Sequence, residues 1–386
     1  MELKNIKSLI YLSRGNLPSQ MAHTAQIAKM SQALSQKVDN FELITSGNLG
    51  AAIRGLDQEF KDWYNLHRDF KLVRLPVHLR KCFPFPKTYQ SSRYFKLALL
   101  YTYLKSPSLV YCRTVPLVER LLKMGIPVLW EWHEPIKDGS SESNFFKYKN
   151  LVGVVTLSQK LAEQYIQIGL DAEKVLVAHS AVELENFLPH QDQKIARNNL
   201  HLPLNQKIIV YSGHLYEGKG IKTIIETAHL LPEYQFILVG GWTGDIERVK
   251  KLCQDENLLN VRLIGHVPQS QLSSYLYAAD ILILPTSQYW NLATFTSPLK
   301  LFEYMAVKKP IVASALPNIM TVLRNRENAL LAEPDDALSF QQAINELIEK
   351  PDLADNIAES AYQEVKNFTW EKRAERVLNF AKARMK

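Results

Sequence analysis

The sequence predicts an α/β protein made of two doubly wound parallel sheets. Short runs of β-branched and aromatic residues alternate with helical patterns along the whole chain, which is typical of parallel sheets that carry helices on both faces. The chain has 386 residues, more than a single hydrophobic core usually holds. A polar stretch at 185–206, which contains Pro189 and Pro203, separates two such series of elements. We therefore predict an N-terminal domain at 1–190 and a C-terminal domain at 191–369.

Each series supplies the strands of one sheet. In the first half we predict helices at 22–35 and 159–169, and strands at 8–12, 41–45, 109–112, 127–130, 152–157 and 175–178. In the second half the predicted strands alternate with helical segments and lie at 208–212, 234–239, 261–264, 281–284 and 311–313. The last pattern, from Trp370 to Arg384, is amphipathic and predicts a helix over 370–386.

Composition and cysteine usage indicate a cytoplasmic protein. Apolar residues make up 46% of the chain and charged residues 22%, which is ordinary for a globular protein. Cys82, Cys112 and Cys253 are scattered and show neither metal-ligand spacing nor a disulfide framework, which favours a reducing compartment. The first residues lack the apolar core of a signal peptide, and no uninterrupted run approaches the roughly 20 apolar residues that span a bilayer. We expect a cytoplasmic protein that is soluble or associated with the inner face of the membrane.

The positive charge of the chain is concentrated in one stretch. The stretch 61–105 has a net charge of +8, because it contains ten Lys and Arg residues and two acidic ones, Asp62 and Asp69. The rest of the chain has a net charge of −1, which gives +7 in total. Ten aromatic residues are interleaved there. Basic and aromatic residues together suit peripheral contact with an anionic membrane surface, but also an acidic acceptor or nucleic acid. A solvated basic face over ordinary core aromatics is the simplest alternative.

Residues 296–306, Thr-Ser-Pro-Leu-Lys-Leu-Phe-Glu-Tyr-Met-Ala, predict a helix that begins directly after a loop. Ser297 is expected to cap this helix and Pro298 to occupy its first position. The free amides and the dipole at a helix start form an anion site, where a phosphate can bind. Glu303 then lies where it can accept hydrogen bonds from sugar hydroxyls. The run indicates nucleotide-sugar binding.

This run, with Lys-Pro-Ile-Val-Ala at 309–313, resembles the donor-binding segment of the family 4 retaining glycosyltransferases. Ser-Gly-His-Leu-Tyr-Glu-Gly-Lys-Gly at 212–220 is similar to the strand–loop–helix segment of that family, and 237–241 and 261–268 are similar to its next two strands and loops. The resemblance extends from about Gln206 to the C-terminus and is weaker before it.

The resemblance implies the GT-B fold, in which two Rossmann-like domains face each other across a cleft. It places the nucleotide-sugar donor in the domain 191–369 and the acceptor in the domain 1–190, with the helix 370–386 packing back on the first domain. Ligands of open α/β sheets bind beyond the carboxyl ends of the strands, which agrees with this division.

Several donor contacts are implied by the resemblance. Lys219 is expected to neutralise the diphosphate, and His214, where the family usually has arginine, to donate one hydrogen bond to it. Glu303 is expected to bind the ribose hydroxyls. The family has a second glutamate eight positions before this one, where the present chain has Phe295. Further donor contacts are expected from the helix start and from two strand-end loops, namely Ser297, Pro298, Leu299, Lys300, Gly240 and Val267.

In the first domain, Trp-Glu-Trp-His-Glu-Pro at 130–135 ends a strand and resembles the family segment whose histidine approaches the donor sugar, which indicates His133. Arg113 closes the preceding strand and is expected to contact an anionic group of the acceptor. Gly15, Asn16 and Ser19 are predicted in the first strand-to-helix loop, Gly15 against the donor and the other two against the acceptor.

The expected reaction is transfer of a sugar from a nucleoside diphosphate, for example UDP, to a glycan or lipid-linked acceptor with retention of configuration, in polysaccharide or glycolipid biosynthesis. His133, Lys219 and Glu303 are the predicted catalytic residues. No Asp-x-Asp motif is present, so we expect neither a metal nor another cofactor. A sugar-nucleotide binding protein without turnover is an alternative. A dinucleotide-dependent oxidoreductase is disfavoured because no Gly-x-Gly-x-x-Gly follows the first strand, and no nucleic-acid binding module is recognisable.

Overall fold

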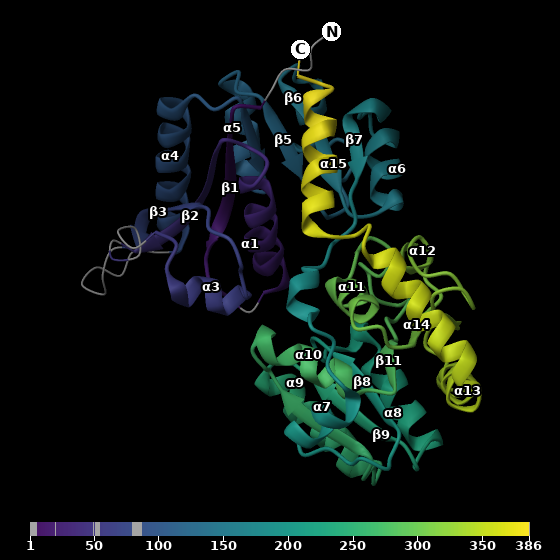
Figure 1. Cartoon of the computed structure of the whole chain (residues 1–386). Helices are drawn as coiled ribbons and strands as arrows, with labels where there is room; N and C mark the ends of the chain where they lie inside the picture. Colours follow the sequence, from purple (N-terminus) through teal and green to yellow (C-terminus); the bar gives the residue numbers. More distant parts are fainter. Residues whose placement is uncertain (1–5, 20, 49, 51–54, 79–86, 386) are drawn as a thin grey trace. The chain divides into compact units, whose positions relative to one another are not determined.

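A computed structural model describes residues 6–19, 21–48, 50, 55–78 and 87–385 of the chain (Figure 1). The chain divides into two compact units, Met1–Ser180 with Trp370–Lys386, and Ala181–Thr369. The division lies before the predicted boundary at 190. The reason is that Val182 already belongs to the second unit, where its amide donates to the carbonyl of Phe368 at 2.9 Å.

The first unit contains a seven-stranded sheet in the order β3-β2-β1-β4-β5-β6-β7, and every pair of neighbours is parallel. Its strands are β1 (Ser8–Asn16), β2 (Asn40–Asn48), β3 (Lys71–His78), β4 (Leu109–Cys112), β5 (Val128–Glu131), β6 (Leu151–Thr156) and β7 (Val175–Val177). Its α-helices are α1 (Ala22–Ser35), α3 (Gln58–Tyr64), α4 (Lys87–Lys105), α5 (Val115–Lys123), α6 (Gln159–Gln167) and α15 (Trp370–Lys382). Short 3-10 helices lie at Ser143–Lys147 and Ala172–Lys174.

The second unit contains a six-stranded parallel sheet in the order β10-β9-β8-β11-β12-β13. Its strands are β8 (Ile208–Ser212), β9 (Gln235–Val239), β10 (Val261–Gly265), β11 (Ile281–Leu284), β12 (Ile311–Ser314) and β13 (Leu330–Ala332). Its α-helices are α7 (Gln193–Asn199), α8 (Ile221–Leu230), α9 (Thr243–Asp255), α10 (Gln269–Ala278), α11 (Leu299–Ala306), α12 (Pro317–Met320), α13 (Ala337–Glu349) and α14 (Pro351–Val365). Short 3-10 helices lie at Leu184–Phe187 and Glu217–Lys219.

Both faces of the second sheet are buried, as the sequence pattern predicts. Along β8, Ile208 and Val210 belong to one hydrophobic cluster, while Ile209 and Tyr211 belong to another. Successive side chains of a strand point to opposite faces, so each cluster fills the space between one face and its helices. The two doubly wound sheets confirm the predicted fold class.

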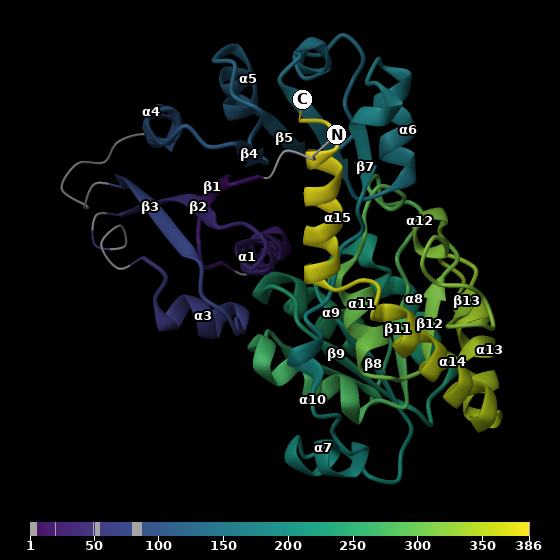
Figure 2. The same ribbon diagram turned by 45° about the horizontal axis from the view of Figure 1, so that its top comes forward.

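Helix α15 follows the second unit in sequence but packs in the first unit, beside α1 (Figure 2). Its buried face includes Trp370, Val377 and Phe380. Gly153 in β6 makes room for this packing, because a Cβ atom there would lie 2.5 Å from the ring of Phe380. This arrangement agrees with the prediction that the last helix packs on the first domain.

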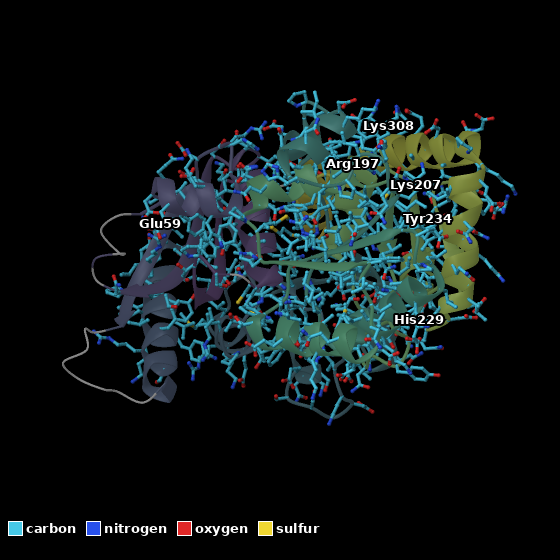
Figure 3. The ribbon with its side chains drawn as sticks, turned by 90° about the horizontal axis from the view of Figure 1, so that it is seen from below. Glu59, Arg197, Lys207, His229, Tyr234 and Lys308 are labelled. Atoms are coloured by element: carbon cyan, nitrogen blue, oxygen red, sulfur yellow. The ribbon has the colours of Figure 1, made fainter. Side chains whose placement is uncertain are left out.

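Charged side chains at the amino ends of β8 and β11 pair with one another. Asp280 precedes β11, and its carboxylate accepts from Arg197 at 2.5 Å and from the amide of Ile208 at 2.7 Å. Lys207 lies 3.5 Å from the same carboxylate. Arg197 and Lys207 are labelled in Figure 3. This cluster holds the start of β8 and β11 together.

Many of the aromatic and basic side chains of the stretch 61–105 are buried in the first unit or paired with carboxylates. Tyr64, Phe70, Tyr94 and Phe95 are buried, and several of the cations are paired: Lys61 with Asp69, and Lys71 and Lys105 with Glu42. On α4 the exposed side chains include Leu100, Tyr103 and Leu104. Part of the stretch, 79–86, lies outside the described residues. Among the residues that are described, no helix has the length and apolarity needed to cross a membrane.

Candidate active site

Both sheets reverse their strand order at one point, between β1 and β4 in the first unit and between β8 and β11 in the second. Loops leave the carboxyl ends of these strands in opposite directions, which opens a crevice where open α/β sheets bind ligands. The sequence-predicted residues His214 and Lys219 follow β8, and Arg113 follows β4.

Lys300 is the most unusual side chain of the second unit. Its ammonium nitrogen is buried and has no hydrogen-bond partner among the described residues. It lies 3.8 Å from the centroid of the Tyr211 ring, and a Cβ atom on Gly213 would be only 2.5 Å from it. Burial, and then the charge of Lys219, lower the pKa of Lys300 well below its usual value. An amine without a partner in such a place is costly unless a ligand supplies the partner.

Lys219 stands at the end of the loop after β8 and rests on aromatic rings. Its Nζ lies 3.7 Å from the ring centroid of Trp290 and 5.1 Å from that of Tyr216. Burial lowers the pKa of Lys219 to about 8. The ring faces attract the ammonium and replace part of its hydration. Trp290 packs in turn on Gly218, where a Cβ atom would be 2.6 Å from the indole.

His214 also lies among aromatic rings near Lys219. It stacks on Trp242 at a centroid distance of 5.6 Å and on Tyr216 at 6.0 Å. Its pKa is lowered by burial and then by the charges of Lys300 and Lys219. At neutral pH the imidazole is therefore a neutral hydrogen-bonding group beside two lysines.

The start of α11 differs from the prediction. The N-cap residue is Pro298, with ψ 127°, and the helix begins at Leu299. Ser297 is buried and does not cap the helix, so the predicted helix start, with Ser297 as cap and Pro298 as first residue, was one residue too early. The extended ψ of Pro298 is the cause, because it keeps the chain out of the helix until the next residue. Pro298 supplies no side-chain cap to the first turn, and the amide of Leu301 donates to the carbonyl of Pro298 at 3.2 Å.

Glu303 lies one turn after Lys300 on α11. Its carboxylate accepts from the side-chain amide of Gln269, at the start of α10, at 3.1 Å. Val267 is on the loop between β10 and α10, with a partly buried side chain that packs on the core. Phe295, in place of the second glutamate, is partly buried and supplies no carboxylate.

Gly240, which is predicted to contact the donor, approaches the backbone of its own chain closely. It has φ 113°, and a Cβ atom there would lie 2.4 Å from the carbonyl oxygen of Gly213. The two strand-end loops after β8 and β9 therefore pack backbone to backbone. Gly240 thus packs on Gly213, which in turn lies against the Lys300 ammonium.

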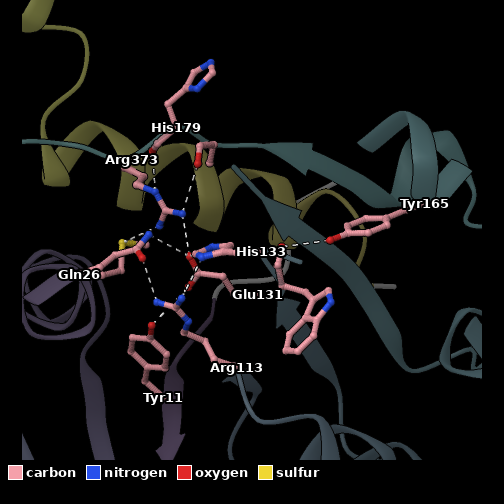
Figure 4. Close-up of polar contacts among 11 residues, drawn as sticks. Tyr11, Gln26, Arg113, Glu131, His133, Tyr165, His179 and Arg373 are labelled. Atoms are coloured by element: carbon pink, nitrogen blue, oxygen red, sulfur yellow. Dashed lines mark hydrogen bonds and ion pairs between the residues drawn. The ribbon is translucent and has the colours of Figure 1, made fainter. Parts of the chain in front are cut away.

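In the first unit, His133 follows β5 and both of its ring nitrogens are engaged (Figure 4). Nε2 lies 2.9 Å from Glu131 Oε1, and Nδ1 lies 2.9 Å from a guanidinium nitrogen of Arg113. An arginine can only donate, so Nδ1 accepts and Nε2 carries the proton. Burial and then the charge of Arg113 lower the pKa of His133 to about 4. A contact of His133 with a donor sugar through nitrogen requires one of these bonds to break.

Glu131 is the centre of this network and was not predicted from the sequence. Its buried carboxylate also accepts from Arg373 of α15 at 2.8 Å and from Tyr11 at 3.3 Å. Arg373 and Arg113 lower the pKa of Glu131 well below its usual range despite its burial. The network fixes the orientation of Arg113 and His133 and ties α15 to the sheet.

The first strand-to-helix loop is shorter than predicted. Strand β1 continues to Asn16, so Gly15 and Asn16 belong to the strand, whose register with β2 shifts between Leu12 and Asn16. Ser19 does lie in the loop, but its amide donates to the Tyr64 hydroxyl at 2.9 Å and its carbonyl accepts from Trp63. Ser19 therefore anchors this loop to α3.

Two sets of functional candidates carried no usable signal in the sequence. Trp290 is an ordinary aromatic residue in a loop, and Arg373 lies 242 positions from its partner Glu131. Only folding brings each to its neighbour. Among the described residues, no group of three or more His, Cys, Asp or Glu side chains is arranged to hold a metal ion. The expectation that the protein uses neither a metal nor another cofactor stays a prediction.

Comparison with known proteins supports a glycosyltransferase. Residues 192–364 match the model of the family described as "Glycosyl transferases group 1", so the second unit is similar to that family. The putative teichuronic acid biosynthesis glycosyltransferase TuaC of Bacillus subtilis is 28% identical over 57% of this chain and 55% of its own. The amylovoran biosynthesis glycosyltransferase AmsK of Erwinia amylovora is 30% identical over 48% of this chain and 44% of its own. The chain thus spans about half the length of the curated relatives it matches.

Solved structures share the fold over nearly the whole chain. A glycosyltransferase from Rickettsia africae superposes with a TM-score of 0.77 at 18% identity, covering 99% of this chain and 100% of that one. The Anabaena protein HepE, in complex with UDP-glucose, superposes with a TM-score of 0.74 at 15% identity, covering 96% and 98%. At these identities the likeness establishes the fold, which is that of glycosyltransferases with two α/β domains.

Proposed function

We propose that this protein is a retaining glycosyltransferase of family 4 type, which moves a sugar from a nucleoside diphosphate to an acceptor hydroxyl. The observation that carries the proposal is the pair Lys219 and Lys300 at the carboxyl edge of the second sheet. Neither has a carboxylate at ion-pair distance among the described residues, and the Lys300 ammonium has no hydrogen-bond partner. A diphosphate supplies the missing negative charge and the missing acceptors.

The same groups suit the departure of the diphosphate. As the bond between the anomeric carbon and the diphosphate oxygen breaks, negative charge grows on that oxygen beside two ammonium groups and the amino-terminal end of α11. Fixed positive groups at a site of developing charge stabilise the transition state. The acceptor oxygen attacks the anomeric carbon from the same face, and its proton passes to the departing phosphate. Glu303, held by Gln269, binds the ribose hydroxyls.

The likeness of other proteins supports the donor class. The HepE structure is a complex with UDP-glucose, and TuaC and AmsK are named for the biosynthesis of teichuronic acid and of amylovoran. We infer a nucleotide-sugar donor, such as a UDP-sugar, and an acceptor in surface polysaccharide or glycolipid assembly.

A thermal-shift screen over UDP, GDP, ADP and their sugars tests the proposal, because binding to the native state alone raises the melting temperature. UMP, GMP and AMP are the matched controls without a second phosphate. A diphosphate that stabilises the protein no more than its monophosphate contradicts the proposed role of the two lysines.

A sugar-nucleotide binding protein without turnover is the second candidate, and Phe295 favours it. The family glutamate that contacts the donor sugar has no counterpart at this position. Formation of a radiolabelled product from a labelled donor and a mixed glycolipid extract separates the two. A protein that binds the donor in the thermal-shift screen and forms no product with any donor is a binding protein.

Contact with an anionic membrane through 61–105 remains part of the proposal. Helix α4 exposes Leu100, Tyr103 and Leu104, and Lys96 is exposed on the same helix. Apolar side chains beside cations bind headgroups of anionic lipids. Sedimentation with vesicles of phosphatidylglycerol, compared with phosphatidylcholine, tests it. A Leu100→Ser, Leu104→Ser variant that sediments as fully as the wild type contradicts it.

A further inference from the structure

The network around Glu131 contains more positive than negative charge. It brings together two guanidinium groups, Arg113 and Arg373, one carboxylate, Glu131, and the imidazole of His133 (Figure 4). The imidazole is neutral, because Arg113 donates to its Nδ1. The network therefore carries a net charge of +1.

The carboxylate is fully used by groups other than Arg113. Glu131 Oε1 accepts from Arg373 at 2.8 Å and from His133 at 2.9 Å, and Oε2 accepts from Tyr11 at 3.3 Å. Arg373 is fixed in addition by the carbonyl of His179 at 2.9 Å. Arg373 and Glu131 thus form a closed ion pair within the network.

Arg113 makes its hydrogen bonds to neutral partners, although the nearby charge of Glu131 also acts on it. Its guanidinium donates to Gln26 Oε1 at 3.0 Å and to His133 Nδ1 at 2.9 Å, and it contacts the Tyr11 hydroxyl. No carboxylate lies at ion-pair distance from it among the described residues. One carboxylate is therefore shared by two buried guanidinium groups, and such an excess of positive charge suits a site where a ligand supplies a further negative charge.

The position of Arg113 is suitable for a ligand. It follows β4 directly, at the point where the strand order reverses, and its backbone amide donates to the carbonyl of Leu12 in β1. The residue is partly exposed. Its positive field reaches His23, whose pKa is lowered by partial burial of the ring and then by the charge of Arg113.

The guanidinium is also held in a fixed orientation. Gln26 accepts from Arg113 through Oε1, and its Nε2 lies 3.5 Å from Glu131 Oε1. The amide therefore cannot turn over without losing both contacts. A planar guanidinium that is fixed before binding offers the N–H donors that are not used by Gln26, His133 and Tyr11 to a carboxylate or phosphate oxygen.

We propose that Arg113 binds an oxyanion carried by the acceptor, so that the acceptor is a phosphorylated or carboxylated molecule. The proposal rests on the proposed transfer function and names its acceptor class. In this assignment Glu131, Gln26 and His133 are positioning residues, which hold the guanidinium at the carboxyl edge of the first sheet. Arg373 neutralises Glu131 so that the charge of Arg113 is left for the ligand.

The test uses the full chain with saturating UDP, so that the diphosphate site is filled and small anions report the other site. UDP binding is measured first, and its absence contradicts the donor proposal independently of this one. Ligand-observed NMR then compares glycerol 3-phosphate with glycerol, and glucuronate with glucose. We expect the anionic member of at least one pair to bind. Preference for phosphate alone indicates a phosphorylated acceptor, preference for glucuronate alone a uronic acid, and preference for both a site that reads charge.

Three variants decide whether Arg113 is responsible. Arg113→Gln is expected to weaken anion binding by about 10- to 100-fold, the effect of losing a charge-assisted hydrogen bond, with UDP affinity unchanged. Arg113→Lys keeps the charge and loses the planar guanidinium, so its affinity for the anion is expected to lie between those of the wild type and Arg113→Gln. It replaces Arg113→Gln in the test if the glutamine variant does not fold. Arg68→Gln removes a partly exposed arginine paired with Glu371 and is expected to bind as the wild type does. Equal anion binding by wild type and the Arg113 variants, or no anion preference in the wild type, overturns the proposal.

Discussion

Replacing Lys300 by methionine is expected to make the protein more stable and its donor binding weaker. Methionine is close to lysine in length and removes a buried amine that has no hydrogen-bond partner. An unsatisfied buried polar group costs about 1–3 kcal/mol, so the free energy of unfolding of the unliganded protein should rise by about that amount. For a domain of this size that is a rise in melting temperature of roughly 2–10 °C.

The same change removes one charge-assisted contact to the diphosphate. Such a contact contributes about 1.5–3 kcal/mol, so the Kd for UDP should rise by about 10- to 100-fold. Calorimetric titration with UDP measures the affinity, and scanning calorimetry without ligand measures the stability. The opposite signs of the two effects distinguish a ligand-binding lysine from a structural one, which would lower stability when removed.

Lys309 provides a matched control. It is also a desolvated lysine, with a pKa lowered by burial to about 8, but it precedes β12 and thus lies at the amino edge of the sheet, near Asp280. Lys309→Met should leave the Kd for UDP unchanged. A Lys300→Met variant that binds UDP as tightly as the wild type, or that is less stable without ligand, refutes the reasoning.

Three further predictions concern the same unit. UDP affinity should fall as the pH rises through about 8, because Lys219 loses its proton there. In titrations from about pH 6.5 to 9.5, Lys219→Arg should remove this part of the pH dependence, because arginine stays protonated. A pH profile that is the same in the variant and the wild type contradicts the prediction. Trp290→Leu should raise the Kd for UDP by about 2- to 30-fold, because the cation–π contact with Lys219 is lost. Trp290→Phe should retain most of the affinity. If the two changes weaken UDP binding equally, the effect of Trp290 comes from its packing and not from the cation–π contact. Gly220→Ala should destabilise the unit by more than about 3 kcal/mol in urea unfolding, because φ is 74° and the Cβ atom would lie 1.6 Å from the Pro285 carbonyl oxygen. Gly244→Ala, in α9 with open space around it, should instead stabilise by about 0.5–1 kcal/mol, and similar losses for both glycines would exclude the steric explanation.

The strands that the sequence predicts best are the ones buried on both faces. Strands β4, β8 and β11 have the predicted bounds, since continuous apolar runs need no partner to be recognised. Strands β3 and β13 were missed. The first is an edge strand that carries Lys71, Arg74 and Pro76, and the second has three residues. Their assignment depends on the neighbouring strand, which the local sequence does not contain.

The candidate site divides in the same way. Lys219, Lys300 and Glu303 could be named because the motifs that resemble the family are local in sequence, and their contacts with a donor stay predictions. The cap at Ser297 was wrong because backbone dihedrals at Pro298, and not residue preference, decide where the helix begins. Predicting that both nitrogens of His133 are engaged would have required knowing that Arg113, 20 positions earlier and at the end of another strand, lies beside the ring opposite Glu131.

The placement of uncompensated charge argues that the carboxyl edges are the working edges of both sheets. At the amino edge of the second sheet, Arg197 and Asp280 neutralise each other and also satisfy backbone groups. At the carboxyl edges, Lys300 and Arg113 have aromatic or neutral partners instead. Carboxylates at those positions would stabilise the free protein by pairing with these cations, but they would also repel a diphosphate or an anionic acceptor. At Lys300 the stability lost by the free protein is therefore expected to be regained when a diphosphate binds, which is the same expectation that the Lys300→Met variant tests.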